Sequence, residues 1–365
     1  MAKITKQSEN FSKWYTDVIL DADLADYGPV KGTMVVKPYG FSLWTNIRES
    51  LNTMIIDSGH ENAYFPLFIP KSFLEKEAKH VEGFAKECAV VTHSKLISED
   101  GSLTVDPGSK LEEEIIVRPT SETIIWHMFK KWITSYRDLP LKVNQWANVV
   151  RWEMRTRLFL RTSEFLWQEG HTAHATKEEA MEETLEIVEI YRTLFEEYLA
   201  IPTIIGRKSN LERFAGADET FSIETMMRDK KALQAGTSHY LGTNFGSAFD
   251  VKFQSKDNKE HPVYATSWGV STRMVGALIM VHGDDKGLKI PPKIAPIQAV
   301  IIPISPKNEK SKEFASFVTM VNEKLSNMGV RTHIDDLDES PGFKFNKWEL
   351  KRVPVRIEIG IREFE

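Results

Sequence analysis

The chain has 365 residues, of which 41% are hydrophobic and 27% charged, and its formal net charge is −5. This length predicts about two domains with a sizeable core, and this charge gives no global basic field for a nucleic acid, although a local patch could still bind one. Cys88 is the only cysteine, which excludes an internal disulfide framework and a multi-cysteine zinc site and favours a reducing compartment.

The N-terminal third of the chain is predicted to contain a helix, a strand and a surface segment. Residues 1–15 contain no apolar stretch of a signal peptide, and no run approaches the roughly 20 apolar residues of a membrane span, so we expect a cytoplasmic protein without a membrane partner. Apolar residues at helical spacing predict a helix over 41–59, and a strand over 62–70 should follow. Residues 98–114 are polar and rich in turn formers, which predicts a surface excursion.

Two further helices are predicted before residue 200. Segment 120–136 places Ile125, Phe129, Trp132 and Tyr136 on one helical face. Segment 176–199 opens with a Thr-x-x-Glu capping box at Thr176 and Glu179 and reads as an amphipathic surface helix. Its apolar stripe is predicted to contain Met181, Leu185, Val188 and Phe195.

Glycine, prolines and lysines in residues 283–296 interrupt all periodicity, so we expect a domain boundary there, with domains 1–290 and 291–365. The first domain mixes long helices with successive strands, which predicts an α+β fold with an antiparallel sheet flanked by helices. Beyond the boundary, strand and helix patterns alternate, which predicts a small α/β domain with parallel pairing. The predicted elements are strand 299–304, helix 311–329, strand 330–335, helix 343–352 and strand 353–361.

Charged residues interrupt a predicted strand pair within residues 149–175. Because side chains alternate along a strand, a hairpin would present Arg151, Glu153, Trp167, Glu169 and His171 on one face. This could be a solvated face with cross-strand ion pairs. The apolar strand ends instead favour partial burial, and buried charges need a partner such as a ligand that carries both signs.

Arginines near this pair are suited to phosphate oxygens. Arg155, Arg157 and Arg161 lie in the connecting loop, where guanidinium groups could act as bidentate donors or simply be exposed. In segment 267–283 a strand leads into a helix capped by Ser271 or Thr272, with Arg273 in the first turn. That arrangement is typical of an anion site, although a capped helix with a surface arginine would read the same way.

Two more polar clusters, 118–123 and 234–242, are each compatible with ordinary turn chemistry. His171 and His174 are three apart in a strand and therefore point to opposite faces, which makes them poor partners for a metal. The sequence contains neither a P-loop nor a G-x-G-x-x-G element, so any nucleotide is held differently.

Together these segments resemble a class II aminoacyl-tRNA synthetase, and specifically the prolyl-tRNA synthetase family of the archaeal and eukaryotic type, from about residue 14 to the end. "GHENAYFPLFIP" is similar to the first class II motif, "RWE" with "FLWQEGHT" to the second and "SWGVSTRMVG" to the third. "RPTSET" and "QAGTSHYLG" resemble segments specific to the prolyl family. The resemblance implies a class II catalytic domain followed by an anticodon-binding-like domain.

The resemblance also implies a nucleotide site. Arg151 should bridge the ATP α-phosphate and the amino-acid carboxylate, Glu153 should accept a hydrogen bond from the adenine amine, and Phe165 should stack on the base. Arg273 should hold the γ-phosphate. The site is expected to be completed by Thr162, Gln234 and Thr237.

A proline site is implied beside it. Thr120 and Glu122 should receive the secondary ammonium of proline, and Pro66 corresponds to a dimer-interface proline. The pocket for the proline ring is expected to be shaped by Arg151, Trp167, Glu169, His171, Phe214 and His239, with Ser267 and Gly269 at its floor.

The implied activity is proline–tRNA ligation by a homodimer: ATP and Mg²⁺ support formation of prolyl-adenylate, and its prolyl group is then transferred to tRNA(Pro) with release of AMP. The sequence does not identify Mg²⁺ ligands. Only residues 172–266 separate the second and third motifs, so we expect no internal editing domain of the bacterial type. Because the anticodon-binding-like segment stops after a third predicted strand, we also expect an incomplete domain, a C-terminal truncation and impaired charging of tRNA.

Two other classes of function stay open. A synthetase-like regulator would bind tRNA or protein without catalysis, and the presence of Arg151, Glu153 and Arg273 disfavours it. An acyl-adenylating ligase would use a different acceptor. Within the class, threonine is a neighbouring substrate, although no zinc-dependent threonine pocket is evident.

Overall fold

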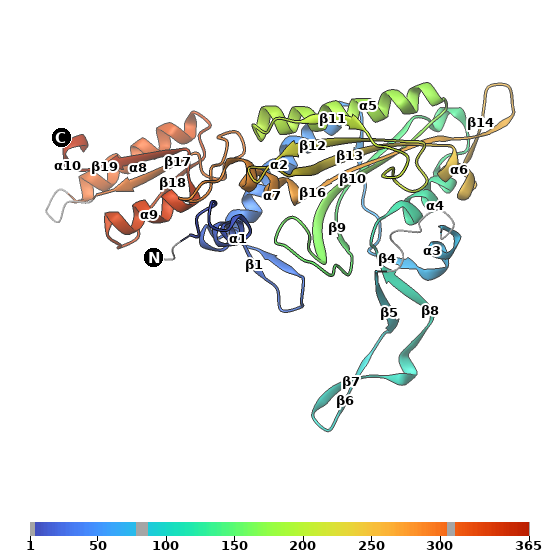
Figure 1. Cartoon of the computed structure of the whole chain (residues 1–365), viewed down its shortest axis with the longest axis horizontal. Coiled ribbons are helices and arrows are strands. Elements are labelled where there is room, and N and C mark those ends of the chain that lie inside the picture. The colour runs from blue at the N-terminus through green and yellow to red at the C-terminus, as the bar shows by residue number, and fades with distance from the viewer. Residues whose placement is uncertain (1–3, 78–86, 305–310, 365) are drawn as a thin grey trace.

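A computed structural model describes residues 4–77, 87–304 and 311–364. Its centre is a seven-stranded sheet in the order β11-β12-β13-β16-β10-β9-β3 (Figure 1). Every neighbouring pair is antiparallel except β3 with β9. In sheet order the strands are β11 (Ile204–Arg207), β12 (Glu219–Met226), β13 (Ala232–Gly242), β16 (Tyr264–Ser271), β10 (Glu164–His174), β9 (Leu141–Val150) and β3 (Glu61–Asn62). The predicted antiparallel sheet is confirmed.

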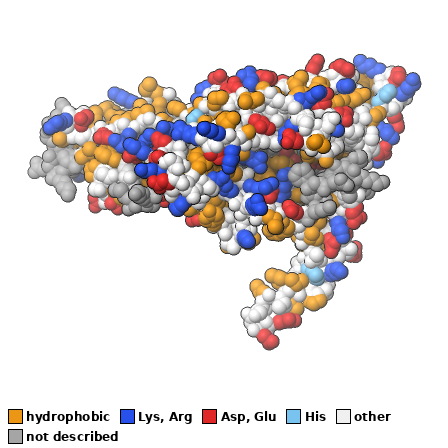
Figure 2. Space-filling model, viewed as in Figure 1, with side chains coloured by type: hydrophobic (Ala, Val, Ile, Leu, Met, Phe, Trp, Pro, Cys, Tyr) orange, Lys and Arg blue, Asp and Glu red, His pale blue; other side chains and the backbone are white. Residues whose placement is uncertain are grey.

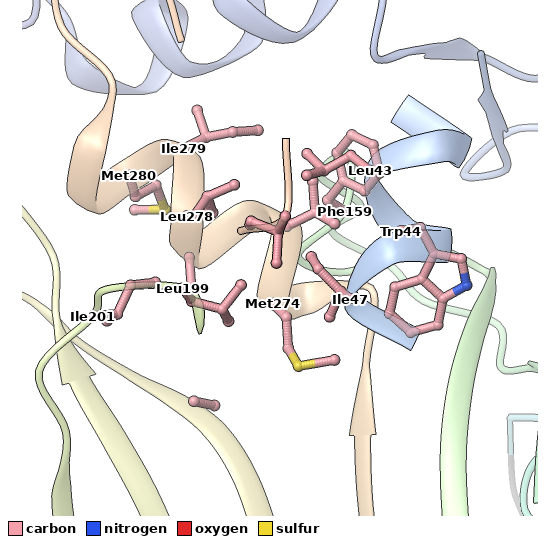
Figure 3. Packing of buried hydrophobic residues seen from close by; sticks show 14 of the residues in the cluster. Leu43, Trp44, Ile47, Phe159, Leu199, Ile201, Met274, Leu278, Ile279 and Met280 are labelled. Carbon is pink, nitrogen blue, oxygen red and sulfur yellow. The ribbon is translucent and has the colours of Figure 1, made fainter. Parts of the chain in front are cut away.

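Helices cover one face of this sheet and bury the main core. These helices are α1 (Phe11–Asp21), α2 (Pro38–Asp57), α5 (Lys177–Thr193) and α7 (Arg273–His282). Figure 3 shows Leu43 and Ile47 of α2 facing Met274 and Leu278 of α7, and all four side chains are buried. Burial of such aliphatic side chains contributes about 1.5–3 kcal/mol each to the free energy of folding.

Helix α5 lies across β10, β12, β13 and β16. Its predicted capping box is confirmed, because the Thr176 hydroxyl accepts from the Glu179 amide and the Glu179 carboxylate accepts from the Thr176 amide. The predicted apolar stripe is wrong at Leu185, which is exposed. The buried face instead includes Ile187 and Tyr191, because the sheet lies to one side of the predicted stripe.

The predicted strand over 62–70 is wrong in its middle. Only its ends pair, in β3 and in β4 (Phe68–Pro70). Between them the backbone is held by side chains: the Phe65 amide donates to Gln145 Oε1 at 2.6 Å, and the Phe65 carbonyl accepts from Arg118 Nη1 at 2.7 Å. A buried arginine and glutamine therefore replace a strand partner here.

The predicted surface excursion at 98–114 has regular structure. It contains a protruding hairpin and the start of a strand of a second sheet, ordered β4-β8-β5 (Figure 1). The elements are β5 (Ala89–His93), β6 (Leu96–Glu99), β7 (Ser102–Val105), η1 (Pro107–Ser109) and β8 (Lys110–Val117). The turn at Asp100–Gly101 makes a hairpin, and both residues have positive φ, as its twist requires.

The helix predicted over 120–136 is α4 (Glu122–Trp132), so Tyr136 lies outside it. The amides of Thr134 and Ser135 donate to the Asp138 carboxylate. With Ser135 as its N-cap, a separate 3₁₀ turn follows, η2 (Tyr136–Asp138). The other elements of this part of the chain are β1 (Ala25–Tyr27), β2 (Met34–Val36), α3 (Lys71–Glu77), the π-helical η3 (Leu194–Tyr198), α6 (Asn244–Ala248), β14 (Lys252–Gln254) and β15 (Glu260–Pro262).

The C-terminal part is a three-stranded parallel sheet, β18-β17-β19, with helices packed on it. The predicted alternation and the parallel pairing are both confirmed. The elements are β17 (Ala299–Pro303), α8 (Ser311–Asn327), β18 (Thr332–Ile334), α9 (Pro341–Lys351), β19 (Val355–Ile359) and α10 (Ile361–Phe364). Across the described ranges, every helix is too short or too polar to span a bilayer.

Candidate functional site

A cavity of about 480 Å³ lies over the middle strands of the large sheet. Lys and Arg side chains gather on this face around β1, β9 and β16 (Figure 2). The cavity lining includes the predicted residues Thr120, Glu122, Arg151, Phe165, Trp167, Glu169, His171, Phe214, Gln234, Thr237, His239, Ser267, Gly269 and Arg273. A second cavity, of about 240 Å³, is lined by Arg151, Glu153, Thr162, Phe165 and Arg273. Pro66 lies outside both and is exposed.

Strand register brings the floor of the cavity together. Glu169 of β10 pairs with Gly269 of β16, which pairs in turn with Thr237 of β13. His171, Ser267 and His239 make the next rung on the same face. Because facing residues of adjacent strands are neighbours, residues distant in sequence share one patch. The segment 234–242 is therefore the interior of a strand, not a turn around a glycine.

Arg151 lies just beyond the end of β9, so it is held by the turn and not by strand alternation as predicted. Its Nε donates to the Pro119 carbonyl at 2.8 Å. Its guanidinium carbon lies 5.5 Å from the ring centroid of Phe165 and 5.4 Å from that of Trp167. Burial lowers the pKa of Arg151, although the nearby Glu122 and Glu169 oppose that shift. The group stays cationic at neutral pH because an arginine pKa starts so high.

Arg273 is the first residue of α7, as predicted. Its amide donates to the Ser271 hydroxyl at 3.2 Å, whereas Thr272 occupies the cap position without a side-chain cap bond. The Nε of Arg273 donates to the Leu160 carbonyl at 3.2 Å. Burial, followed by the charge of Arg161, lowers the pKa of Arg273. Arg151 and Arg273 line both cavities, so two cations far apart in the chain face one hollow.

Two buried carboxylates provide the opposite charge. Glu122 accepts a short hydrogen bond from the Thr120 hydroxyl at the start of α4. Glu169 accepts from Gln145 Nε2 at 2.8 Å and also from Ser121, and it lies 3.3 Å from His171 Nε2. Burial alone would raise the pKa of Glu169, but the hydrogen bonds from His171, Ser121 and Gln145 outweigh it and lower that pKa. The site can therefore bind a cation at this end.

His239 is buried and neutral. Its ring stacks on Phe214 with centroids 4.6 Å apart, and its Nδ1 lies 2.9 Å from the Thr220 hydroxyl. Burial, reinforced by the charge of Lys208, lowers the pKa of His239 to about 3. This wall of the cavity is thus flat, aromatic and uncharged at neutral pH, which suits an apolar ring.

The second cavity contains the two predicted residues that the first lacks. Glu153 pairs with Arg161, with 3.0 Å between Oε2 and Nε. The Thr162 hydroxyl donates to the Glu164 carbonyl at 2.7 Å and so supports the loop. Because Arg151, Phe165, Ser271 and Arg273 line both hollows, an elongated ligand could extend from one into the other.

Sequence reasoning missed several residues that complete this site. Gln145 and Ser121 hold Glu169, Thr220 holds His239, and Lys208 makes a short hydrogen bond to Gln234. None stands in a distinctive motif except Ser121, which is part of "RPTSET". In the ranges that the structure covers, no group of three or more His, Cys, Asp or Glu is arranged to hold a metal ion.

Comparison with known proteins identifies the family. Residues 104–282 match the tRNA synthetase class II core domain (G, H, P, S and T), and residues 298–365 match the anticodon binding domain. The chain is 59% identical to a proline–tRNA ligase of Bacteroides fragilis over 99% of its own length and 73% of that protein. The chain belongs to the proline–tRNA ligase family of class II aminoacyl-tRNA synthetases.

Other members of the family are similarly close. Proline–tRNA ligases of Flavobacterium johnsoniae and Porphyromonas gingivalis are each 57% identical to the chain, over 99% and 100% of it and over 74% and 75% of the relatives. Membership confirms the predicted fold class, a class II catalytic core with an anticodon-binding domain. Class II synthetases use ATP, so the family accounts for a cavity with two arginines beside two carboxylates.

Proposed function

We propose that the chain activates proline with ATP and transfers the prolyl group to tRNA(Pro). The proposal depends on the observation that Arg151, Arg273, Glu122 and Glu169 all line one hollow. A zwitterionic amino acid and a triphosphate together have the complementary charges. The reaction is in-line attack of the prolyl carboxylate on the α-phosphorus, which forms prolyl-adenylate and releases pyrophosphate; a ribose hydroxyl of the tRNA then attacks the activated carbonyl.

ATP is proposed to lie along the two connected cavities. Arg151 would contact both the α-phosphate and the attacking carboxylate, Arg273 the γ-phosphate, and Phe165 the adenine face. Glu153 would accept from the adenine amine, with Thr162, Gln234 and Thr237 around the nucleotide. The carboxylate is already a nucleophile at neutral pH, so catalysis would depend on positioning and charge neutralisation, without a general base.

Proline is proposed to lie at the acidic end of the large cavity. Its secondary ammonium would be received by Thr120 and Glu122, next to the buried Glu169. The remaining pocket is supplied by Trp167, His171, Phe214, His239, Ser267 and Gly269. A neutral His239 stacked on Phe214 supports this assignment, because a flat apolar wall suits a five-membered ring.

Mg²⁺ is proposed as the companion of ATP. Mg²⁺ commonly takes one or two carboxylates together with substrate phosphates and water, so a dedicated protein cage is not required. Glu87 lines the smaller cavity together with Arg273 and fits that demand, whereas Glu153 is assigned to the adenine amine. When bound, the ion would neutralise phosphate charge.

The wider organisation is also proposed. We place the domain boundary at residues 290/291, between the two matched families, and assign tRNA(Pro) recognition to the segment after it. We further propose a homodimer with Pro66 at its interface, and the archaeal and eukaryotic type without internal editing. Residues 172–266, which separate the second and third motifs, are occupied by α5, η3, β11 to β15 and α6, which supports the latter.

Proline-dependent exchange of labelled pyrophosphate into ATP tests the activity. We expect exchange with proline, less with alanine or cysteine, and none with threonine. Arg151→Lys should lower kcat/KM about 10²-fold or more, because a lysine cannot reproduce a fixed two-donor contact in the transition state. Arg192→Lys, in an exposed ion pair on α5, is the matched control. Exchange that ignores proline, or equal losses in the two variants, would refute the proposal.

A further inference from the structure

A hairpin of residues 25–36, formed by β1 and β2, contacts the nucleotide side of the site. None of the sequence motifs described above includes these residues. We call residues 151–163 the arginine loop, because Arg151, Arg155, Arg157 and Arg161 lie in it. The hairpin lies beside this loop (Figure 1), and Ser163 donates its amide to the Gly32 carbonyl at 2.8 Å. None of the proposed substrate contacts comes from the hairpin.

A chain of main-chain hydrogen bonds leads from the hairpin to Arg151. The Ser163 amide donates to the Gly32 carbonyl, and the Ser163 carbonyl accepts from the Arg151 amide, also at 2.8 Å. Ser163 is only 2% exposed. The backbone of Arg151 is therefore fixed through one residue by the tip of the hairpin, at the point where β9 has already ended.

Gly32 is suited to this contact for two reasons. Its φ is +87°, in the left-handed region that a side chain disfavours. A Cβ at this position would lie 2.4 Å from Ser163 Oγ and 2.8 Å from Thr156 Cγ2. Because Ser163 is buried, its hydroxyl has little room to turn away. Any side chain at residue 32 would push the arginine loop off the hairpin.

Other contacts hold the loop to the N-terminal elements. The Phe159 amide lies 3.3 Å from Met34 Sδ on β2, and the Tyr15 hydroxyl donates to the Leu158 carbonyl at 2.8 Å. Phe159 is buried with φ +60°, an unfavourable conformation for a bulky residue. Such a conformation persists only where the surroundings determine it strongly. The N-terminal elements thus impose the shape of the loop.

We infer that the β1–β2 hairpin positions the arginine loop for adenylate formation, with Gly32 as the positioning residue. This inference rests on the proposed function, because it concerns the placement of Arg151 during transfer to the α-phosphorus. Most of the proposed proline pocket lies on β10, β13 and β16, which are held by their own sheet. Displacement of the hairpin should therefore reduce the rate of activation far more than the affinity for proline.

Gly32→Ala tests the inference by steady-state pyrophosphate exchange. We expect kcat to fall about tenfold or more, because small misplacements of a reacting group have large effects on rate. KM for proline should rise by a clearly smaller factor, because Arg151 is only one of the proposed proline contacts. Gly101→Ala is the matched control: Gly101 also sits at a hairpin tip with positive φ, +78°, but no other atom lies within 4 Å of the place where its Cβ would be. It should lose similar stability and keep its kcat.

A rescue separates a displaced loop from general strain. Ser163→Ala removes the nearer of the two atoms in collision, Ser163 Oγ, and leaves both main-chain bonds, whereas Thr156 Cγ2 stays. Gly32→Ala/Ser163→Ala should therefore regain part of the lost kcat, and Ser163→Ala alone should resemble the parent chain. Failure of the rescue, or a Gly101→Ala loss equal to that of Gly32→Ala, would overturn the inference.

Hydrogen exchange provides a readout that does not depend on the activity. The Arg151 and Ser163 amides should exchange about tenfold faster in Gly32→Ala than in the parent chain or in Gly101→Ala, because their acceptors move away. Unchanged protection would refute the positioning role even in an active enzyme. Loss of protection in a chain without proline-dependent exchange would refute the proposed function alone.

Discussion

Glu169 and His171 form a buried pair at the floor of the large cavity, and their protonation is linked to stability. Burial disfavours both charges, yet the contact with Glu169 raises the pKa of His171, and the contacts of Glu169 lower its own pKa. A raised histidine pKa stabilises the fold below its ordinary value near 6.5 and loses this effect as pH rises through the folded value. A lowered glutamate pKa stabilises above about 4.5 and loses its effect as pH falls. The pair is therefore fully effective between these values.

Glu169→Gln should reveal this window. At about pH 5.5 we expect a loss of about 3–5 kcal/mol in the free energy of unfolding, because a buried charged His171 loses its hydrogen-bonded carboxylate partner. The loss should be smaller at about pH 8.5, where the imidazole sheds its proton more readily. Denaturant titration of the chain without substrates measures both values. Glu186→Gln, at an exposed position near Lys142, should change little at either pH; a loss that is the same at both pH values would contradict the linkage.

At the scale of elements, the packing in the middle of the large sheet depends on one close contact, between Gly170 of β10 and Trp268 of β16. The two residues pair across the strands, and a Cβ on Gly170 would lie 2.0 Å from the indole ring. The Trp268 side chain belongs to the main hydrophobic core and meets His60 with ring centroids 5.0 Å apart. Its neighbours Ser267 and Gly269 line the cavity. The packing of Trp268 therefore helps to fix the position of these two residues in the cavity.

Gly170→Ala should destabilise the chain by about 1–3 kcal/mol or more, because the indole cannot move without shifting β16. Gly206→Ala is a matched control, since Gly206 also lies in a strand but has open space where a Cβ would be. Thermal unfolding compares the two. Equal unfolding midpoints would mean that Trp268 moves aside and that its contact with Gly170 does not limit the stability of the sheet.

At the scale of the whole molecule, the C-terminal part is attached to the rest by polar contacts around Asp284. This carboxylate lies 2.9 Å from Lys289 in its own segment, and it pairs across the boundary with Arg352, just after α9, at 3.2 Å. Lys351 lies 3.5 Å from Asp23, close to the start of the β1–β2 hairpin. Partly exposed pairs of this kind contribute up to about 1 kcal/mol each, so the attachment should be specific but weak.

Asp284→Asn should therefore lower the free energy of unfolding by about 1 kcal/mol and weaken protection of α9 against proteolysis. Asp257→Asn is the comparison, because the Asp257 contacts are confined to its own turn. Limited proteolysis and denaturant titration would check both effects. Identical cleavage rates in the two variants would show that the Asp284 pairs do not hold the C-terminal part in place.

Local patterns in the sequence determined much of this molecule. The capping box of α5, the helix start at Arg273 and the alternation in the C-terminal part follow from interactions between residues close in the chain, and such signals are readable without a fold. Face alternation likewise predicted Trp167, Glu169 and His171 as one group, because the period of a strand is independent of its partners.

Only the tertiary structure decided how these pieces meet. The order of the strands places Gly269 between Glu169 and Thr237. It also brings Gln145 and Ser121 within hydrogen-bond distance of Glu169. Leu185 was mispredicted because a helix pattern does not say where the sheet will lie. The contact of Gly32 with Ser163 was invisible for the same reason: contacts between residues more than a hundred positions apart depend on how all the intervening elements pack, and no local pattern encodes that.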